Sequence, residues 1–194
     1  GSIIYKIFAD KQHLLWLATQ EEGLYCVDPH SGKIIKHYTA GTGSENIFSN
    51  TASDIEQLND SIIIYGGGVL NFINKRTGKV RLLKYEDGLP SNNVLRLRMD
   101  KAGFLWIVTS NGLCRYNPNN NRITPYGRRD GVLLGEQANV ADYACADGQI
   151  IFGGSNAVVM FNPSVFLNDQ PPPDVTITDF QLFSKFIPVD SLQQ

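Results

Sequence analysis

The sequence lacks long hydrophobic runs, and this absence excludes a membrane-spanning helix. Its longest unbroken apolar stretches hold five residues, as at 14–18 and 104–108, whereas a helical span needs about twenty. It also lacks an excess of either charge: 17 Lys and Arg against 19 Asp and Glu give a formal net charge of −2. A nucleic-acid partner would require a basic surface. We therefore expect no nucleic-acid partner and no membrane contact by this fragment.

Cysteine and histidine are scarce, which argues against a metal or redox centre. The three cysteines are odd in number and show no Cys-x-x-Cys spacing, so we interpret them as small buried hydrophobic residues and leave their redox state open. The three histidines all lie in the first repeat unit, without a Ser, Cys or carboxylate placed to form a nucleophile–base pair. The residues concerned are Cys26, Cys114, Cys145, His13, His30 and His37. We assign no catalytic, metal-binding or cofactor-binding residue, and expect no cofactor.

What the sequence does contain is a passage that recurs four times. Residues 100–118 read DKAGFLWIVTSNGLCRYNP, and residues 10–29 read DKQHLLWLATQEEGLYCVDP, with the Trp six positions after the Asp in both. Two further copies without the Trp occupy 62–74 and 150–163. Each copy holds two short runs of β-branched and aromatic residues joined by a turn, which predicts a β-hairpin. The polar residue that ends the second run recurs in steps of 46, 43 and 45 residues.

This period predicts the blades of a β-propeller. A repeat of about 45 residues built from short strands is typical of that fold, and no window sustains the periodicity of a helical repeat. We expect an all-β chain of four consecutive four-stranded blades, with the last strand of the fourth blade missing from the pattern. The blades should occupy about 3–46, 47–90, 91–136 and 137–167. The residues at the Trp position, Trp16, Ile63, Trp106 and Ile151, should lie in the core.

The two ends of the chain differ from the repeats. Residues 1–2, Gly-Ser, read as a cloning scar, so we expect an excised fragment. Residues 168–173 end in three consecutive prolines and predict a stiff, extended linker. After the linker, residues 175–183 read as a strand, and the remaining residues are too few to build a second core. We therefore interpret 174–194 as the truncated start of a further domain.

Four charged residues on the expected innermost strands alternate in sign. Lys6 and Arg96 each lie ten residues before a Trp, and Asp54 and Asp142 lie nine residues before the equivalent Ile. Adjacent blades would bring opposite charges together near the axis, where charges are costly unless they are paired. Two interpretations stay open: cross-blade ion pairs that fix the order of the blades, or coincidence among solvent-facing residues in a wet channel. The sequence identifies no ligand-binding residue.

Several motifs resemble those of a known family. The pattern Asp-Lys-x-x-x-Leu-Trp-[Ile/Leu]-x-Thr, then Gly-Leu-x-x-[Tyr/Val]-[Asn/Asp]-Pro, resembles the two-component regulator propeller repeat. Residues 87–94, DGLPSNNV, resemble the connection between its blades. Residues 171–183, PPPDVTITDFQLF, resemble the entry into the Ig-like (triple-Tyr) domain that follows such propellers. The resemblance covers the whole chain and implies that 174–194 begin an Ig-like domain.

The resemblance implies a sensor. Such repeats form the periplasmic sensor region of Bacteroides-type hybrid two-component system histidine kinases, inner-membrane proteins that detect oligosaccharides and signal through a phosphorelay. Family propellers usually have about seven blades, so this chain would be the last part of one propeller. It would contribute to carbohydrate sensing and to signal transmission. Its ligand would be an oligosaccharide, and its partners would be the remaining blades and the Ig-like domain of the parent chain.

Two other functions fit the predicted fold. A propeller enzyme of the lyase type would need His and acidic residues converging from several inner strands, and these strands contain no His. A structural or adhesive module fits the fold equally well but does not explain the Ig-like entry. We favour the sensor, with no catalytic activity in this chain. Because four blades of a larger ring expose apolar faces and unpaired edges, we also expect homo-oligomers.

Overall fold

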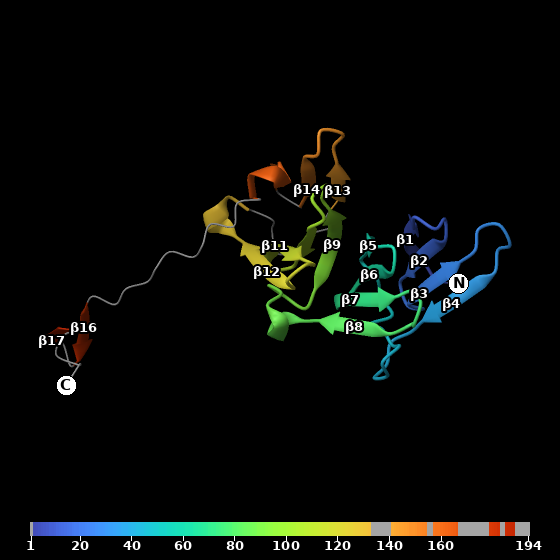
Figure 1. Ribbon diagram of the computed structural model, residues 1–194, viewed down its shortest axis with the longest axis horizontal. Helices are drawn as coiled ribbons and strands as arrows, with labels where there is room; N and C mark the ends of the chain where they lie inside the picture. Colours follow the sequence, from blue (N-terminus) through green and yellow to red (C-terminus); the bar gives the residue numbers. More distant parts are fainter. Residues whose placement is uncertain (1, 133–140, 155–156, 167–178, 183–184, 189–194) are drawn as a thin grey trace. The chain divides into compact units, whose positions relative to one another are not determined.

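The first part of the chain is a series of antiparallel sheets (Figure 1). The computed structural model describes residues 2–132, 141–154, 157–166, 179–182 and 185–188. The chain divides into two compact units, Gly1–Ser164 and Val165–Gln194. In the first unit, three four-stranded sheets and a sheet with three described strands follow one another in chain order. This confirms the predicted all-β arrangement of four propeller blades, and the described residues of the fourth blade form three strands.

Within each blade the strands are hydrogen-bonded in the order in which they occur in the sequence. The first blade contains β1 (Ile4–Ala9), β2 (Leu15–Thr19), β3 (Leu24–Val27) and β4 (Ile34–Tyr38). The second contains β5 (Asp54–Asn59), β6 (Ile62–Gly67), β7 (Val69–Asn74) and β8 (Val80–Leu83). The third contains β9 (Val94–Met99), β10 (Leu105–Thr109), β11 (Gly112–Asn117) and β12 (Arg122–Tyr126). The fourth contains β13 (Ala141–Ala144), β14 (Ile150–Gly153) and β15 (Val158–Phe161).

Helical structure in the described part of the chain is confined to three short 3-10 turns. They are η1 (Tyr85–Asp87), η2 (Arg128–Asp130) and η3 (Pro163–Phe166). The first two begin the connections that lead from one blade to the next, and each ends at a glycine with positive φ. Glycine suits these positions because other residues rarely adopt that backbone conformation. None of the helices that the structure describes is long and apolar enough to cross a membrane.

The second unit is described only where it forms a hairpin. Strands β16 (Asp179–Leu182) and β17 (Lys185–Pro188) pair antiparallel. β16 lies within the strand predicted at 175–183, while 175–178 and 183 are outside the described residues. The linker predicted at 168–173 also lies outside them. The blade boundaries and the Ig-like start at 174 stay predictions.

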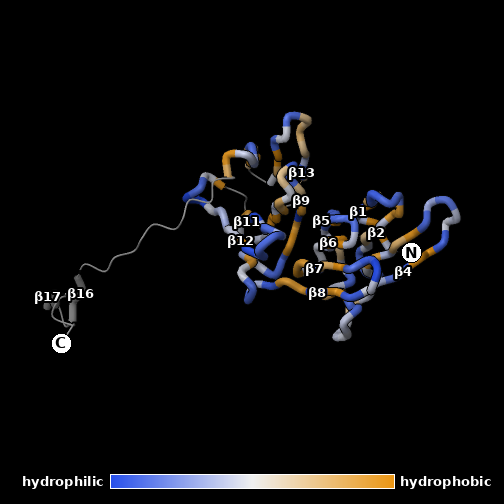
Figure 2. The backbone as a smooth tube through the Cα atoms, viewed as in Figure 1, coloured by the Kyte–Doolittle hydropathy of each residue, from blue (hydrophilic) through white to orange (hydrophobic). Residues whose placement is uncertain are grey.

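The core lies between the blades. In Figure 2 hydrophobic stretches follow the strands and hydrophilic stretches mark the turns. Trp16, Ile47 and Tyr65 belong to a buried cluster between the first and second blades. A second cluster, between the second and third blades, is built from side chains such as Leu70 and Leu105. The alternation of side chains along each strand supplies both faces of a blade with apolar groups, so each sheet can pack on two neighbours.

The structure alters one equivalence inferred from the sequence. Trp16 faces the second blade, and Trp106 faces the fourth, where its ring centroid lies 4.5 Å from that of Phe161. In the second blade the residue on the corresponding face is Ile64, whereas Ile63 packs toward the first blade. The residue predicted at the Trp position of the second blade, Ile63, therefore lies one position before the residue that occupies it, Ile64. Both isoleucines are fully buried, while Ile151 in the fourth blade is only half-buried.

Candidate functional site

The innermost strands of successive blades bring charged side chains together. Lys6 on β1 extends to Asp54 on β5, with 2.8 Å between Nζ and Oδ1. Their side chains are 30% and 1% exposed, respectively. The other carboxylate oxygen of Asp54 accepts a hydrogen bond from the backbone N–H of Leu97 on β9, at 3.0 Å. Asp54 therefore links three blades, and its burial is compensated by a cation and an amide donor.

The third and fourth blades are linked by two arginines. Arg96 on β9 lies 3.6 Å from Asp142 on β13, measured from Nε to Oδ1. Its Nη1 also donates to the backbone carbonyl of Ser53, at 3.2 Å. Arg98, two residues further along β9, forms a second ion pair with Asp142 and approaches Glu56 of the second blade, with 3.9 Å between Nη1 and Oε2. All four sequence-derived charge positions thus lie in cross-blade ion pairs.

The strand pairing shows that Asp142 is not equivalent to the other three charge positions. Three of the positions pair with a residue that lies two positions after the Trp or its equivalent, Ile64. These pairs are Lys6 with Ala18, Asp54 with Gly66 and Arg96 with Val108. Asp142 pairs with Phe152, only one residue beyond Ile151. Adjacent residues of a strand point to opposite faces. Asp142 therefore faces back toward the third blade, rather than sharing the position of the other three.

Glu56 and Arg98 extend the charged axis, and neither was identified from the sequence. Each lies two residues after a predicted charge position, Asp54 or Arg96, and so points to the same face of its strand. That spacing is the signal that could have identified them. Burial raises the pKa of Glu56, although Arg98 and backbone N–H groups favour its ionised form.

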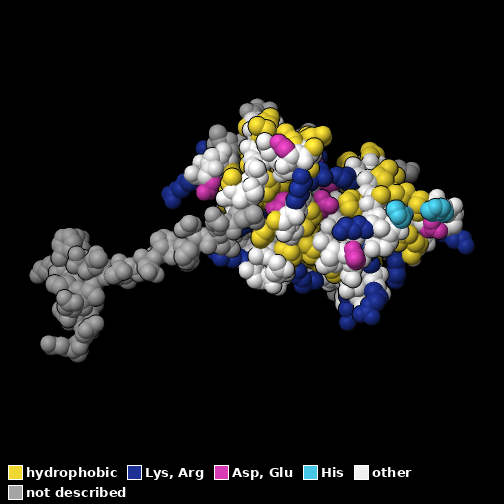
Figure 3. All heavy atoms as spheres, turned by 45° about the horizontal axis from the view of Figure 1, so that its top comes forward, with side chains coloured by type: hydrophobic (Ala, Val, Ile, Leu, Met, Phe, Trp, Pro, Cys, Tyr) yellow, Lys and Arg dark blue, Asp and Glu magenta, His cyan; other side chains and the backbone are white. Residues whose placement is uncertain are grey.

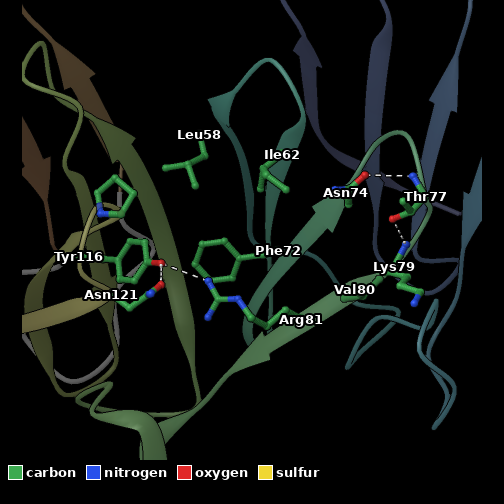
Figure 4. Close-up of a pocket in the computed structure, with 11 residues that line it drawn as sticks. Leu58, Ile62, Phe72, Asn74, Thr77, Lys79, Val80, Arg81, Tyr116 and Asn121 are labelled. Carbon is green, nitrogen blue, oxygen red and sulfur yellow. Dashed lines mark hydrogen bonds between the residues drawn. The ribbon is translucent and has the colours of Figure 1, made fainter.

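A cavity of about 610 Å³ opens between the second and third blades (Figure 4). It lies where the β5–β6, β7–β8 and β11–β12 turns meet, at the opposite end of the sheets from the blade-to-blade connections. Phe72 and Tyr116 provide aromatic surface, with ring centroids 5.3 Å apart. Lys79 and Arg81 add two cationic groups. The sequence repeat does not indicate this cavity, because the cavity forms only when two blades pack together.

The cysteines and His37 lie in surroundings that explain them as structural residues. Cys26 and Cys114 are free and buried, and burial raises their thiol pKa values to about 11 and about 12. Cys145 is a free, half-buried thiol. The His37 ring stacks on Tyr25 with centroids 3.9 Å apart. Within the described ranges, no three His, Cys, Asp or Glu residues are grouped as metal ligands would be. The two raised pKa values keep these thiols protonated, and therefore weak nucleophiles, at neutral pH.

The fold places the chain among β-propellers, and comparisons with known proteins narrow the class. Residues 88–111 match the family described as two component regulator propeller. Histidine kinase P4 from Formosa agariphila is 29% identical over 103 residues, which cover 53% of this chain and 8% of that protein. Residues 88–111 are therefore similar to a two component regulator propeller repeat, and the chain spans a small part of the curated relative that it matches.

Solved structures support the same fold. The extracellular domain of a hybrid two component system from B. thetaiotaomicron aligns with a TM-score of 0.69 at 19% identity, covering 83% of this chain and 23% of that one. Virginiamycin B lyase from Staphylococcus aureus aligns with a TM-score of 0.60 at 14% identity, covering 83% and 53%. At these identities the likeness shows the fold alone. The extracellular domain of a two component system and a lyase share this architecture, so function must be argued from other observations.

Proposed function

We propose that this chain is a propeller segment of the extracytoplasmic sensor region of a hybrid two-component system, located in the periplasm. The match of residues 88–111 to two component regulator propeller repeats carries the proposal. The 29% sequence identity to a histidine kinase over 53% of the chain supports the proposal. The likeness to the virginiamycin B lyase is one of fold and does not favour an enzyme.

The proposed role is to contribute to oligosaccharide sensing and to transmit the signal to a histidine kinase. The kinase chemistry would lie elsewhere in the parent protein. The end faces of the array are suited to packing against further blades of that protein, because they carry exposed apolar side chains. These include Ile7 and Ile34 on the first blade, and Tyr143 and Met160 on the fourth. In Figure 3 hydrophobic side chains gather over both of these blades.

The axial ion pairs have a different proposed role, which is to fix the order of the blades rather than to bind a ligand. Asp54 is buried and already holds Lys6 and a backbone amide. Asp142 holds two arginines. Carboxylates paired in this way offer a ligand little free charge. Opposite charges on neighbouring blades would instead favour one blade sequence over any permutation of it.

Phosphorylation of the intact parent protein tests the sensor function. Membrane vesicles containing that protein would be exposed to a panel of neutral and charged oligosaccharides, and kinase autophosphorylation would be measured. A response to at least one sugar, abolished when the segment corresponding to this chain is deleted, is the expected result. A kinase that responds equally well without this segment would overturn the proposal.

A further inference from the structure

The cavity between the second and third blades carries positive charge that no carboxylate among its described lining residues neutralises. The lining includes Lys79 and Arg81 but no Asp or Glu. Among the described residues Arg81 forms no ion pair, in contrast to Arg96 and Arg98 on the axis. A guanidinium exposed to an apolar cavity without an anionic partner is a site at which a ligand anion would gain a charge-assisted hydrogen bond.

The protein holds this guanidinium in one place. The Arg81 Cζ lies 4.0 Å from the centroid of the Phe72 ring, and its Nη2 donates to the hydroxyl of Tyr116 at 3.1 Å. The Tyr116 hydroxyl in turn donates to Asn121 Oδ1, at 2.6 Å. Figure 4 shows Arg81 beside Phe72, with dashed lines joining the Tyr116 hydroxyl to Arg81 and to Asn121. Stacking on a ring and a hydrogen bond from the next blade orient Arg81 before any ligand binds.

The remaining walls suit a small ring-shaped ligand. Leu58 and Ile62 contribute apolar surface, and Lys79 stands on the exposed β7–β8 turn beside Thr77. A volume of about 610 Å³ lies within the usual range of small-molecule sites. Apolar and aromatic walls with a few convergent polar groups are the typical lining of such sites.

We propose that this cavity binds an anionic sugar, whose carboxylate or sulfate groups are held by Arg81 at one end of the cavity and by Lys79 at the other, while its ring lies against the apolar wall. The choice of a sugar rests on the sensor function proposed above; the choice of an anion rests on the charges of the cavity alone. Phe72 and Tyr116 of adjacent blades both line the site. A bound ligand would therefore contact two blades at once, as expected of a ligand that stabilises one packing of the propeller.

Matched pairs of sugars test the site directly by calorimetry on the 194-residue chain. The first pair is trigalacturonic acid and its methyl ester, which differ in charge. The second is galactose 6-sulfate and galactose, which tells a sulfate ligand from a carboxylate one. We expect at least one anionic member to bind about tenfold or more tightly than its neutral counterpart, the value of one charged hydrogen bond. Equal affinities within both pairs, or no binding by either acid, would overturn the proposal.

Two variants and a control place the binding in the cavity. Lys79→Gln and Arg81→Gln should each weaken binding of the anionic sugar by about tenfold. Arg76→Gln changes an exposed charge of the same turn that does not line the cavity, and should leave the affinity unchanged. Lys79 is exposed, so its variant keeps the test valid if Arg81→Gln does not fold.

The outcomes separate this site from the sensor function. An affinity that is insensitive to Lys79→Gln, or that falls equally with Arg76→Gln, overturns the site. The sensor function is judged by kinase autophosphorylation in the intact parent protein, with neutral sugars in the panel. A parent protein that signals normally with Lys79→Gln and Arg81→Gln would overturn the site while leaving the sensor function standing.

Discussion

At the scale of single residues, the repeated Asp explains the strongest feature of the sequence. Asp100 accepts hydrogen bonds at 2.9 Å from the backbone N–H groups of Ala102 and Phe104 and from the indole Nε1–H of Trp106. Asp10 holds the matching three donors of the first blade at 2.9 to 3.0 Å. One carboxylate thus closes the turn and anchors the core Trp, which requires the six-residue spacing.

Replacing this carboxylate should be costly. Asp100→Ala leaves the Trp106 indole N–H and two turn amides without their acceptor, so we expect a loss of about 2 to 3 kcal/mol in the free energy of unfolding, measured with urea. Asp147→Ala is the control, because Asp147 accepts hydrogen bonds from Gln149 in an exposed turn rather than from a core residue. It should cost less than about 1 kcal/mol. Equal losses in the two variants would contradict this role of the Asp.

The pH dependence of stability should carry the signature of Asp10. Burial raises the pKa of this group, but hydrogen bonds from Trp16 and Leu14 together with the Lys75 ammonium, 3.1 Å away, outweigh it and leave the pKa below its ordinary value of 3.8. A lowered folded-state pKa stabilises the protein above the unfolded pKa, and this contribution disappears as the pH falls through the folded pKa.

We therefore expect Asp10→Asn to flatten the acid limb of the stability curve. Urea unfolding of the wild type should lose free energy progressively below about pH 4, while the variant, already less stable at neutral pH, should lose less over the same range. Parallel curves for the two proteins would show that this carboxylate does not contribute to acid sensitivity.

At the scale of elements, the turns decide how the strands of a blade can approach. Gly23, which precedes β3, has a φ of +83°, and a Cβ atom there would lie 2.2 Å from the backbone oxygen of Tyr38 on β4. Gly103, which precedes β10, has a similar φ of +87°, but a Cβ atom added there would meet no atom within 4 Å. The two glycines share a backbone requirement and differ only in the space around them.

Alanine substitutions at Gly103 and Gly23 distinguish the cost of backbone strain from the cost of steric overlap. Gly103→Ala should cost about 1 kcal/mol, the value of a left-handed conformation for a residue with a Cβ. Gly23→Ala should cost at least about 2 kcal/mol more, because backbone atoms of β4 would have to move. Thermal and urea unfolding measure both. Similar losses would mean that the first blade adapts to the extra atom.

At the scale of the whole molecule, the axial charges connect blades that are far apart in sequence. Coupling between Lys6 and Asp54 can be isolated by a double-mutant cycle with Lys6→Met and Asp54→Asn. Because Lys6 is partly exposed and Asp54 is buried, we expect a coupling of about 1 to 2 kcal/mol that shrinks as salt is added. The same reasoning predicts that Arg96→Met lowers stability and its salt dependence. A coupling near zero would leave the pairs without a role in blade order.

The end faces of the array should govern its association state. Tyr143 and Met160 are 65% and 62% exposed and lie in one cross-strand row on the outer face of the fourth blade. We expect the isolated chain to self-associate, with a light-scattering mass that rises with concentration. Met160→Lys should shift it toward the monomer, whereas Asn120→Lys, on an exposed turn, should not. A clean monomer at all concentrations would contradict the prediction.

Features that depend on neighbouring residues could be predicted from the sequence alone. These are the hairpins, the Asp–Trp spacing and the four-fold period, because turn geometry and the two-residue alternation of a strand are local properties. The fold followed, since sheets with two apolar faces must stack on one another.

The packing of whole blades sets which faces meet. Ile64 rather than Ile63 takes the Trp position, since Asp54 pairs with Gly66 just as Lys6 pairs with Ala18 in the first blade. The sequence shows neither the partners that Arg98 finds on two other blades nor the bond between Arg81 and Tyr116, which lie 35 residues apart. Such contacts depend on the register and the mutual orientation of the blades, and these are fixed only when the sheets pack together.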